Sequence, residues 1–211
     1  FLSIAAQSDA LLHVVDASAG IDSSGRITET GTGDPVSDFA DIEEELNMWY
    51  QKILEGNREK LQKMIKSEND HISALTELYQ GLGVKNSHVM ESLRITGLEG
   101  KNIENYDLHD SKKLSTQLRK ISKPTLIVAN KIDVPGADKN FVRLRERYND
   151  MIVVPASADS ELTLRRAEQK DLIKYSPGSE LFDILKTSEL NQKQKDALDF
   201  IKKDIMGEYM R

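Results

Sequence analysis

The chain of 211 residues lacks cysteine altogether and has no long run of apolar residues. Without cysteine it can form no disulfide framework, no thiolate nucleophile and no cysteine-ligated zinc site. Its longest apolar runs extend over about five residues, whereas a helix needs about 20 to cross a bilayer. The N-terminal residues show neither the charged nor the apolar region of a secretory signal. We therefore expect a cytoplasmic protein that does not enter membranes.

An excess of basic charge is missing as well. The 29 Lys and Arg residues face 35 Asp and Glu residues, which leaves a net charge of −6. Such a chain has no overall attraction to DNA or to acidic membranes. Its 38% hydrophobic and 30% charged residues are typical of a globular protein, and its length corresponds to about 1.4 typical domains. It begins at Phe1 and not at methionine, so we expect an excised or incomplete segment.

Three short apolar runs predict β-strands, at residues 11–15, 125–129 and 151–155. Continuous apolar runs of this length are typical of central strands in a parallel sheet, buried on both faces. A helical pattern at residues 140–148 separates the second run from the third. This alternation predicts an α/β fold with right-handed crossovers. Because ligands bind at the carboxyl ends of such strands, we expect the functional site there.

A long helical segment separates the first two predicted strands. Asp34 and Pro35 predict a capped helix start, Gly56 a turn, and Gly81 the end of a second helix. Apolar residues follow at helical spacing: Phe39, Ile42, Leu46, Trp49, Ile53, Leu61, Ile65, Ile72, Leu75 and Tyr79. Two helices of about 21 residues with so narrow a stripe favour an antiparallel coiled-coil hairpin. The alternative is an ordinary helical bundle packed on the sheet.

Beyond the third predicted strand the helical patterns are shorter. Ser160 is placed to cap a helix that follows it. The tail at residues 191–211 has Leu198, Ile201 and Ile205 at helical spacing, which predicts a C-terminal helix.

The strongest functional signal is the sequence Asn130-Lys131-Ile132-Asp133, directly after the second predicted strand. A carboxylate at Asp133 can accept two hydrogen bonds from guanine, one from N1–H and one from the exocyclic N2 amine. Adenine has an unprotonated N1 and no 2-amino group, so it would leave the carboxylate underpaired. The motif is short, and its polar residues could equally form Asx turns at the end of a strand. Its position at the carboxyl end of a strand favours guanine recognition.

A second loop, Ala156-Ser157-Ala158, ends the third predicted strand and is expected beside the first. We expect the backbone amide of Ala158 to donate to guanine O6, where the amino group of adenine would place donor against donor. Ser157 and Ala158 would close the base pocket. The methylene stem of Lys131 would cover one face of the base, and Asn130 would stabilise the loop and reach the purine edge. The expected binding residues are Asn130, Lys131, Asp133, Ser157 and Ala158.

Together the two loops resemble the fourth and fifth motifs of translation-factor-class P-loop GTPases. Residues 8–18 (SDALLHVVDAS), the helical insertion after them and residues 157–167 (SADSELTLRRA) are similar to the Obg-related YchF type, in its archaeal style. The resemblance extends over essentially the whole chain. It implies a protein that binds GTP with Mg²⁺, hydrolyses the γ-phosphate and acts with a ribosome or another translation-related partner. Asp133 and Lys131 argue for GTP, while ATP stays open because relatives that depart from this motif favour it.

Two motifs that the family places before its counterpart of Phe1 are absent from the chain. No G-x-x-x-x-G-K-[ST] sequence occurs, and residues 97–102, which come nearest, lack its spacing and its hydroxyl. No strand ends in D-x-x-G. The resemblance therefore implies the second half of a G domain, with no catalytic residue or metal site of its own and with Mg²⁺ bound through the missing motifs. Since phosphoryl transfer depends on those motifs, we expect this chain alone to be inactive.

The resemblance divides the chain into four parts. Residues 1–33 and 123–190 would form two parts of the G domain, the second with the base-recognition loops. Residues 34–122 would form a helical, coiled-coil-like insertion, and residues 191–211 a C-terminal helix that leads to a missing TGS-type domain. The expected fold class is thus α/β, a partial P-loop NTPase G domain with a parallel sheet and a helical insertion.

Other candidate residues have structural interpretations. Asp16 follows an apolar strand, as a metal-binding Asp would, but we expect it to organise the loop at the end of that strand. His13 is expected to be a core histidine, and the other histidines lack the spacing of zinc ligands. The basic clusters predict solvated helix faces or an RNA surface without aromatic platforms. They contain Lys112, Lys113, Arg119, Lys120, Lys123, Arg143, Arg145, Arg147, Arg165 and Arg166.

An interaction scaffold is the alternative function. In that case the helices of residues 35–80 would dock a partner, and the nucleotide fold would carry out no turnover. The missing P-loop favours the scaffold if residues 1–211 are a natural mature chain.

Overall fold

The computed structural model describes residues 2–22, 24–68 and 70–209. The chain divides into two compact units. Unit 1 consists of residues 1–13 and 39–126, and unit 2 consists of residues 14–38 and 127–211. Strands β1 (Leu11–Asp16) and β2 (Thr125–Asn130) have residues in both units. Among the described residues, no helix has the length and apolar character needed to cross a membrane.

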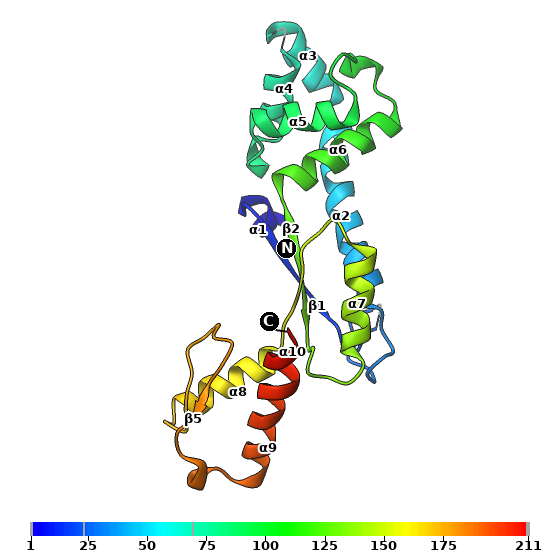
Figure 1. Ribbon diagram of the computed structural model, residues 1–211. Helices are drawn as coiled ribbons and strands as arrows, with labels where there is room; N and C mark the ends of the chain where they lie inside the picture. Colours follow the sequence, from blue (N-terminus) through cyan, green and yellow to red (C-terminus); the bar gives the residue numbers. More distant parts are fainter. Residues whose placement is uncertain (1, 23, 69, 210–211) are drawn as a thin grey trace. The chain divides into compact units, whose positions relative to one another are not determined.

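A three-stranded sheet in the order β1–β2–β3 contains the three predicted strands, of which Figure 1 labels β1 and β2. Strand β3 (Val153–Pro155) pairs with β2 in parallel, with Ile127 opposite Val153. On the other side of β2, the amide of Ala17 donates to the carbonyl of Asn130 at 2.9 Å, which joins the end of β1 to the end of β2. Helices lie between the strands in sequence. The predicted α/β class with a parallel sheet is confirmed.

Burial of all three strands on both faces was expected, and this expectation is wrong. Val15 in β1 is 4% exposed but its neighbour Val14 is 58% exposed, and Ile152 beside β3 is 65% exposed. Only β2 lies between two other strands, and there Ile127 and Ala129 are fully buried. Strands β1 and β3 are the edges of this short sheet, and one face of β1 is open to solvent.

Unit 1 is a bundle of helices. It contains α1 (Leu2–Gln7), most of α2 (Pro35–Gly56), α3 (Arg58–Glu68), α4 (His71–Leu78), α5 (Asn86–Thr96) and α6 (Leu108–Ser122). Two short 3₁₀ turns lie in the connections between these helices: η1 (Gln80–Leu82) between α4 and α5, and η2 (Ile103–Asn105) between α5 and α6.

One hydrophobic core joins the helices from α2 to α6. Tyr50 and Tyr79 stack within it, with ring centroids 5.5 Å apart. The Tyr79 hydroxyl donates to the Tyr50 carbonyl at 2.8 Å, and the Tyr50 hydroxyl lies 3.0 Å from Ser122 Oγ, so both buried hydroxyls have partners. The other large core residues include Leu54, Leu61, Leu75, Val89, Leu93, Leu114 and Leu118.

The prediction of a second long helix, which would complete a coiled-coil hairpin, is wrong. Helix α3 ends at Glu68 and a separate helix, α4, begins at His71. The Asp70 carboxylate accepts from the Ile72 amide at 2.9 Å and from the Ser73 hydroxyl at 2.5 Å, which caps a new helix. The segment is therefore an ordinary helical bundle and not a long two-helix hairpin.

Two basic residues that were predicted on solvated helix faces are buried in unit 1. Arg119 in α6 is 1% exposed, and its guanidinium forms a two-pronged ion pair with the Glu43 carboxylate of α2. It also donates to the Asn47 side chain at 3.1 Å. Lys123 donates to the Ala6 carbonyl at 2.9 Å, and burial lowers its pKa. These charges link parts of the bundle, so they are not available to RNA.

Unit 2 contains the carboxyl ends of β1 and β2, strand β3, and the helices α7 (Ala137–Arg147), α8 (Ala158–Glu168) and α9 (Gln192–Phe200). A π-helical segment, η4 (Ile201–Met206), and α10 (Gly207–Tyr209) follow α9. Strand β4 (Ile173–Lys174) pairs antiparallel with β5 (Asp183–Ile184), and η3 (Thr187–Glu189) is a 3₁₀ turn.

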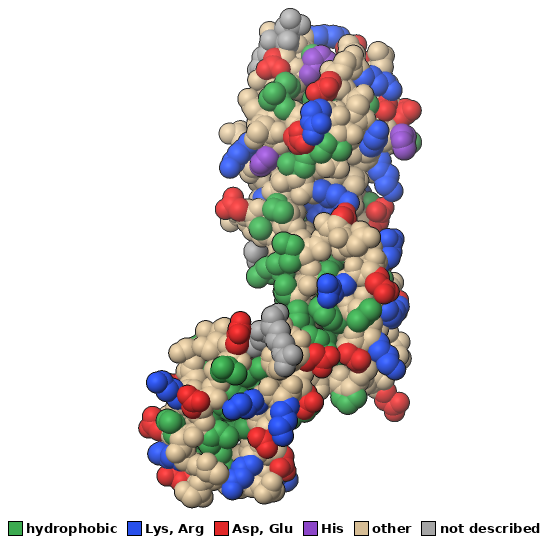
Figure 2. Space-filling model, in the orientation of Figure 1, with side chains coloured by type: hydrophobic (Ala, Val, Ile, Leu, Met, Phe, Trp, Pro, Cys, Tyr) green, Lys and Arg blue, Asp and Glu red, His purple; other side chains and the backbone are tan. Residues whose placement is uncertain are grey.

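A second core packs α8 and the β4–β5 ribbon against α9 and η4. It contains Leu164, Leu172, Ile173, Tyr175, Phe182, Leu190, Leu198, Ile201 and Met206. Leu198 and Ile201 are 2% and 4% exposed, which confirms the apolar stripe predicted for the C-terminal helix. On the face drawn in Figure 2, basic and acidic side chains are interspersed.

We expect Arg119→Ala to lower the free energy of unfolding by about 3 to 5 kcal/mol, because it leaves the Glu43 carboxylate poorly solvated and without its partner. The matched control is Lys112→Ala, since Lys112 pairs with Glu44 at 3.2 Å between the same two helices but is 57% exposed. Its expected cost is below about 1 kcal/mol. Urea unfolding followed by circular dichroism measures both, and equal costs would contradict a structural role for the buried pair.

Candidate functional site

The loops that follow β1, β2 and β3 meet at one edge of the sheet, because the strands are parallel and end together (Figure 1). Backbone hydrogen bonds join each loop to its neighbour. The Ala17 amide donates to the Asn130 carbonyl at 2.9 Å, the Ala156 amide to the Ala129 carbonyl at 2.9 Å, and the Ile132 amide to the Ala156 carbonyl at 3.1 Å. The structure thus brings the two sequence-predicted loops together.

Asn130 links the loop after β2 to the loop after β3. Its side-chain Oδ1 accepts a hydrogen bond from the backbone amide of Ala158 at 3.1 Å. This is the amide that was expected to donate to guanine O6. A base in this position would therefore take over or share a hydrogen bond that Asn130 already makes.

Lys131 connects the loop after β2 to the loop after β1. Its φ of +65° lies in the left-handed region, which is uncommon for a residue with a side chain and marks local strain. Its ammonium group lies 2.7 Å from Asp16 Oδ2, while its side chain stays 46% exposed. The ion pair fixes the ammonium group of Lys131 and leaves part of the Lys131 side chain accessible to solvent.

Asp16 organises the loop after β1, as its position predicts. Its side chain is 6% exposed, and its Oδ1 accepts from the amide of Ser18 at 3.0 Å and from the hydroxyl of Ser18 at 2.6 Å. Burial alone would raise the pKa of the Asp16 carboxyl, but hydrogen bonds from Lys131 and Ser18 outweigh it and hold that pKa below its ordinary value. The carboxylate is thus ionised and occupied by donors of the chain itself.

The family resemblance places Mg²⁺ on motifs outside this chain, and the strand-end loops do not offer Asp16 as a free ligand. Asp16 already binds Lys131 and Ser18. Over residues 2–22, 24–68 and 70–209, no group of three His, Asp or Glu side chains could hold a metal ion.

Asp133 lies in the turn that follows β2 and is half-buried. Its carboxylate makes no hydrogen bond and no ion pair within the part of the chain that the structure describes. The turn itself is well fixed, because Ile132 is 5% exposed and the Val134 amide donates to the Lys131 carbonyl at 3.0 Å. Asp133 therefore presents two free acceptor oxygens from a fixed backbone position.

Ser157 caps α8, so the expectation that Ser160 caps this helix is wrong. The hydroxyl of Ser157 accepts from the Ser160 amide at 3.1 Å and lies 2.8 Å from the Ser160 hydroxyl. The helix begins directly after the loop of β3, three residues earlier than expected. Ala158 is its first residue, which fixes the direction of the Ala158 amide.

One supporting residue, Asn140 in α7, has no counterpart in the sequence reasoning. Its side-chain amide donates to the carbonyl of Ala17 at 2.9 Å and so holds the loop after β1. Only its polar side chain within an amphipathic helix distinguishes it, and no spacing or motif marks it as part of the site.

A cavity of about 440 Å³ opens beside these loops in unit 2. Its lining is mostly apolar and includes Val14, Val128 and Ile205, while Asn130 and Ser157 are among its polar residues. An apolar cavity with a few oriented polar groups at its rim is typical of ligand sites. Asn130, Ser157 and Ala158 thus border this open space, whereas Lys131 and Asp133 are not among its described lining residues.

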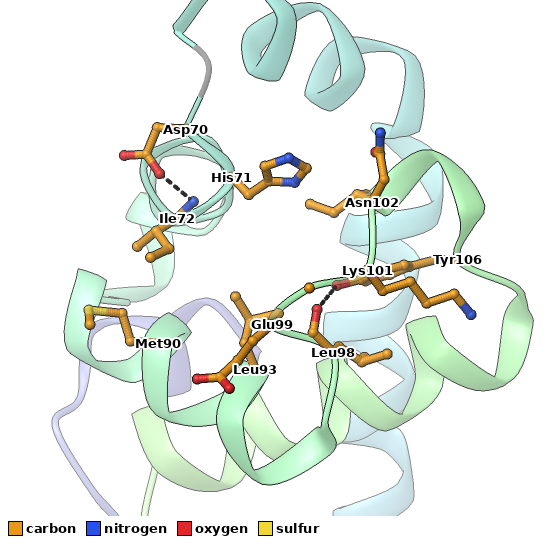
Figure 3. Close-up of a pocket in the computed structure, with 12 residues that line it drawn as sticks. Asp70, His71, Ile72, Met90, Leu93, Leu98, Glu99, Lys101, Asn102 and Tyr106 are labelled. Carbon is orange, nitrogen blue, oxygen red and sulfur yellow. Dashed lines mark hydrogen bonds between the residues drawn. The ribbon is translucent and has the colours of Figure 1, made fainter.

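A second cavity, of about 400 Å³, lies in unit 1 (Figure 3). Two of its charged residues are used by the chain, because Asp70 caps α4 and the Lys101 ammonium binds Asp110 at 2.5 Å, whereas Glu99 forms no ion pair among the described residues. In Figure 3 the side chain of Lys101 points away from the cavity. This cavity therefore has less of the character of a polar ligand site than the strand-end loops.

Known proteins match this arrangement. Residues 128–211, which contain both base-recognition loops, match the family described as "Obg-like GTPase YGR210-like, G4 motif-containing domain". A solved GTP-binding protein from Pyrococcus horikoshii OT3 aligns with a TM-score of 0.77 at 30% identity, over 100% of this chain and 58% of that one. The chain is thus similar to Obg-like GTPases over residues 128–211 and to a GTP-binding protein over its whole length. The resemblance that its two loops suggested is confirmed.

Two sequence relatives of this chain are described as GTP-binding proteins. The relative from Methanocaldococcus jannaschii is 37% identical over 209 residues, which cover 99% of this chain and 51% of the relative. The relative from Schizosaccharomyces pombe is 31% identical over 192 residues, which cover 88% of this chain and 45% of the relative. The chain thus spans about half the length of the curated relatives that it matches.

We expect Asp16→Asn to lower the free energy of unfolding by about 1 to 2 kcal/mol at neutral pH, because an amide cannot replace the carboxylate in its bonds to Lys131 and Ser18. The folded pKa of Asp16 is depressed. Its stabilisation is therefore complete above the ordinary Asp pKa and is lost as the pH falls through the folded value. Urea titrations from pH 6 to pH 3 should show the difference between wild type and variant shrinking.

The control for this titration is Asp138→Asn, which changes an exposed carboxylate of α7. It should alter the free energy of unfolding by less than about 0.5 kcal/mol. A difference for Asp16→Asn that stays constant over this pH range would contradict the ion-pair account.

Proposed function

We propose that this chain supplies the guanine-binding part of a GTP-hydrolysing protein of the Obg-like family. Asn130, Lys131, Asp133, Ser157 and Ala158 form the base site. The observation that carries the proposal is the half-buried, unpaired carboxylate of Asp133, which lies in a turn joined to the loop after β3. Ionised carboxylates at such positions are strong acceptors for a ligand with two adjacent N–H groups.

Guanine offers those two donors, N1–H and the N2 amine, on one edge. Because the Asp133 oxygens have no partner to give up among the described residues, both hydrogen bonds would be gained without breaking others. Adenine offers neither donor, so the desolvated carboxylate would be left without a partner in that complex. The site therefore favours guanine over adenine.

The Ala158 amide provides the second point of discrimination. It donates to Asn130 Oδ1 at 3.1 Å, and guanine O6 is an acceptor of the same kind. O6 can therefore replace or share this bond at little cost. The amino group of adenine at the same place is a donor, which the amide repels.

Lys131 would cover one face of the base. Its ammonium is held by Asp16 at 2.7 Å, so the methylene stem extends from the loop after β2 toward the loop after β1. A stem held at both ends loses little further conformational entropy when a planar ring packs on it. Asp16 thus contributes to binding through Lys131.

We also propose the wider role of the full protein. It would bind GTP with Mg²⁺ through motifs outside this chain, hydrolyse the γ-phosphate, and couple that cycle to a ribosome or another translation-related partner in the cytoplasm. Residues 1–33 and 123–190 would belong to the G domain, residues 34–122 to an insertion, and residues 191–211 to the connection with a further domain. The GTP-binding relatives in an archaeon and a yeast support the nucleotide part of this proposal.

Titration of the ¹⁵N-labelled chain with GMP and AMP tests the base site, since a monophosphate reports base contacts without a phosphate cradle. We expect GMP to shift the amide signals of Ala158 and Lys131 and to bind at least about tenfold more tightly than AMP. Asp133→Asn should remove this preference, whereas Asp138→Asn, an exposed carboxylate outside the site, should retain it. Equal responses to GMP and AMP in the wild-type chain would contradict the proposal.

We expect the purified 211-residue chain not to hydrolyse GTP. It has no G-x-x-x-x-G-K-[ST] sequence, and its described residues provide no metal-binding cluster. A phosphate-release assay with GTP and Mg²⁺ measures this directly. Turnover above the buffer blank that disappears in Asp133→Asn would show that the expectation is wrong.

A further inference from the structure

A third cavity, of about 320 Å³, lies in unit 2 between α8 and α9, away from the base site. Its floor consists of Leu172, Leu190 and Leu198, which are 8%, 5% and 2% exposed. Ala167 and Ala197 form its sides, and both are small enough to leave room for a side chain from outside. We call this cavity the cationic groove because of the residues at its rim.

Three basic side chains surround the cationic groove: Arg166, Lys170 and Lys193. All three are exposed, and none forms an ion pair within the described residues. They come from two separate stretches of chain, in and after α8 and in α9. No acidic residue lines the groove. The three cations thus form a positively charged patch on a chain whose net charge is −6.

Three acidic residues near the groove in sequence have partners, whereas Glu168 and Asp171 are exposed and form no ion pair among the described residues. Glu161 pairs with Arg165 at 2.6 Å, Glu189 lies 3.8 Å from Lys186, and Asp196 accepts from the Gln192 side chain at 2.7 Å. They are not free to neutralise the three cations of the rim. Among the described residues, no carboxylate lies within ion-pair distance of the three rim cations.

Two of the uncharged polar residues that line the groove are used by α9, and the third is Thr163. Asn191 and Gln194 cap α9 reciprocally, with the Asn191 side chain accepting from the Gln194 amide at 3.0 Å and the Gln194 side chain accepting from the Asn191 amide at 2.9 Å. The groove thus combines an apolar floor with three positive charges. A fitting ligand combines an apolar group with several separated negative charges.

We propose that the cationic groove binds an acidic segment of a partner protein, with a leucine-sized side chain in the groove and carboxylates on either side of it. Each carboxylate would pair with one of the three rim cations, and burial of the apolar side chain would add a non-electrostatic contribution. This interaction surface is separate from the base site and does not depend on the proposed guanine specificity.

Charge and shape favour a peptide over other anions. A single-stranded RNA would satisfy the cations, but the groove lacks the aromatic side chains on which bases stack. A fatty acid would fill the apolar floor, but its one carboxylate would leave two of the three cations unpaired. An acidic peptide supplies apolar and anionic groups in alternation.

Fluorescence anisotropy with the labelled heptapeptide DELDELD and the 211-residue chain tests the proposal at low ionic strength. We expect saturable binding that weakens with added salt, and about tenfold weaker binding of the control peptide DESDESD, which lacks the apolar side chains. Arg166→Glu with Lys170→Glu should weaken DELDELD binding by about tenfold or more. Lys193→Glu, from the other side of the groove, should weaken it independently.

The matched control is Lys60→Glu with Lys63→Glu, two exposed and unpaired lysines of α3 that give the same change in net charge. It should leave the affinity for DELDELD within about twofold of wild type. Three results would overturn the proposal: no binding of DELDELD, equal losses in the two double variants, or tighter binding of a seven-nucleotide RNA that is lost in the Arg166 and Lys170 variant.

Discussion

Parallel pairing of β2 with β1 and β3 is the constraint on which the candidate site depends. Because the three strands end together, the loops after them lie within hydrogen-bonding distance of one another. Side chains are not needed to bring them together. The bonds from Ala17 to Asn130 and from Ala156 to Ala129 are made by the backbone alone, each at 2.9 Å. The left-handed conformation of Lys131 and the fixed turn at Asp133 follow from this arrangement.

Each unit contains an ion pair that stabilises it internally. In unit 1 the buried Arg119 pairs with Glu43, and in unit 2 the buried Asp16 pairs with Lys131. Burial of a charge is unfavourable unless a partner and further hydrogen bonds compensate for it, and both sites have such additional bonds. These pairs select one geometry for their helices or loops. The unpaired charges that remain, such as Asp133, are therefore the ones available to ligands.

The sequence was sufficient for the parts of the fold that depend on local pattern. Apolar runs located the three strands, and the short polar motifs after them located the loops that the structure joins. The break before α4 could not be predicted, because apolar spacing continues across Asp70 while its carboxylate caps a new helix. Burial of Arg119 and exposure of Val14 were also inaccessible, since residue type alone does not show which face of an element is covered.

The most direct test of the central claim compares GMP with IMP, which lacks only the 2-amino group, by calorimetric titration of the wild-type chain and of Asp133→Ala. If the Asp133 carboxylate accepts from that amine, the wild-type chain should bind IMP about tenfold or more weakly than GMP, as the loss of one charge-assisted hydrogen bond requires. In Asp133→Ala the two affinities should become equal. Equal affinities in the wild-type chain, or the same ratio in both proteins, would contradict guanine recognition by Asp133.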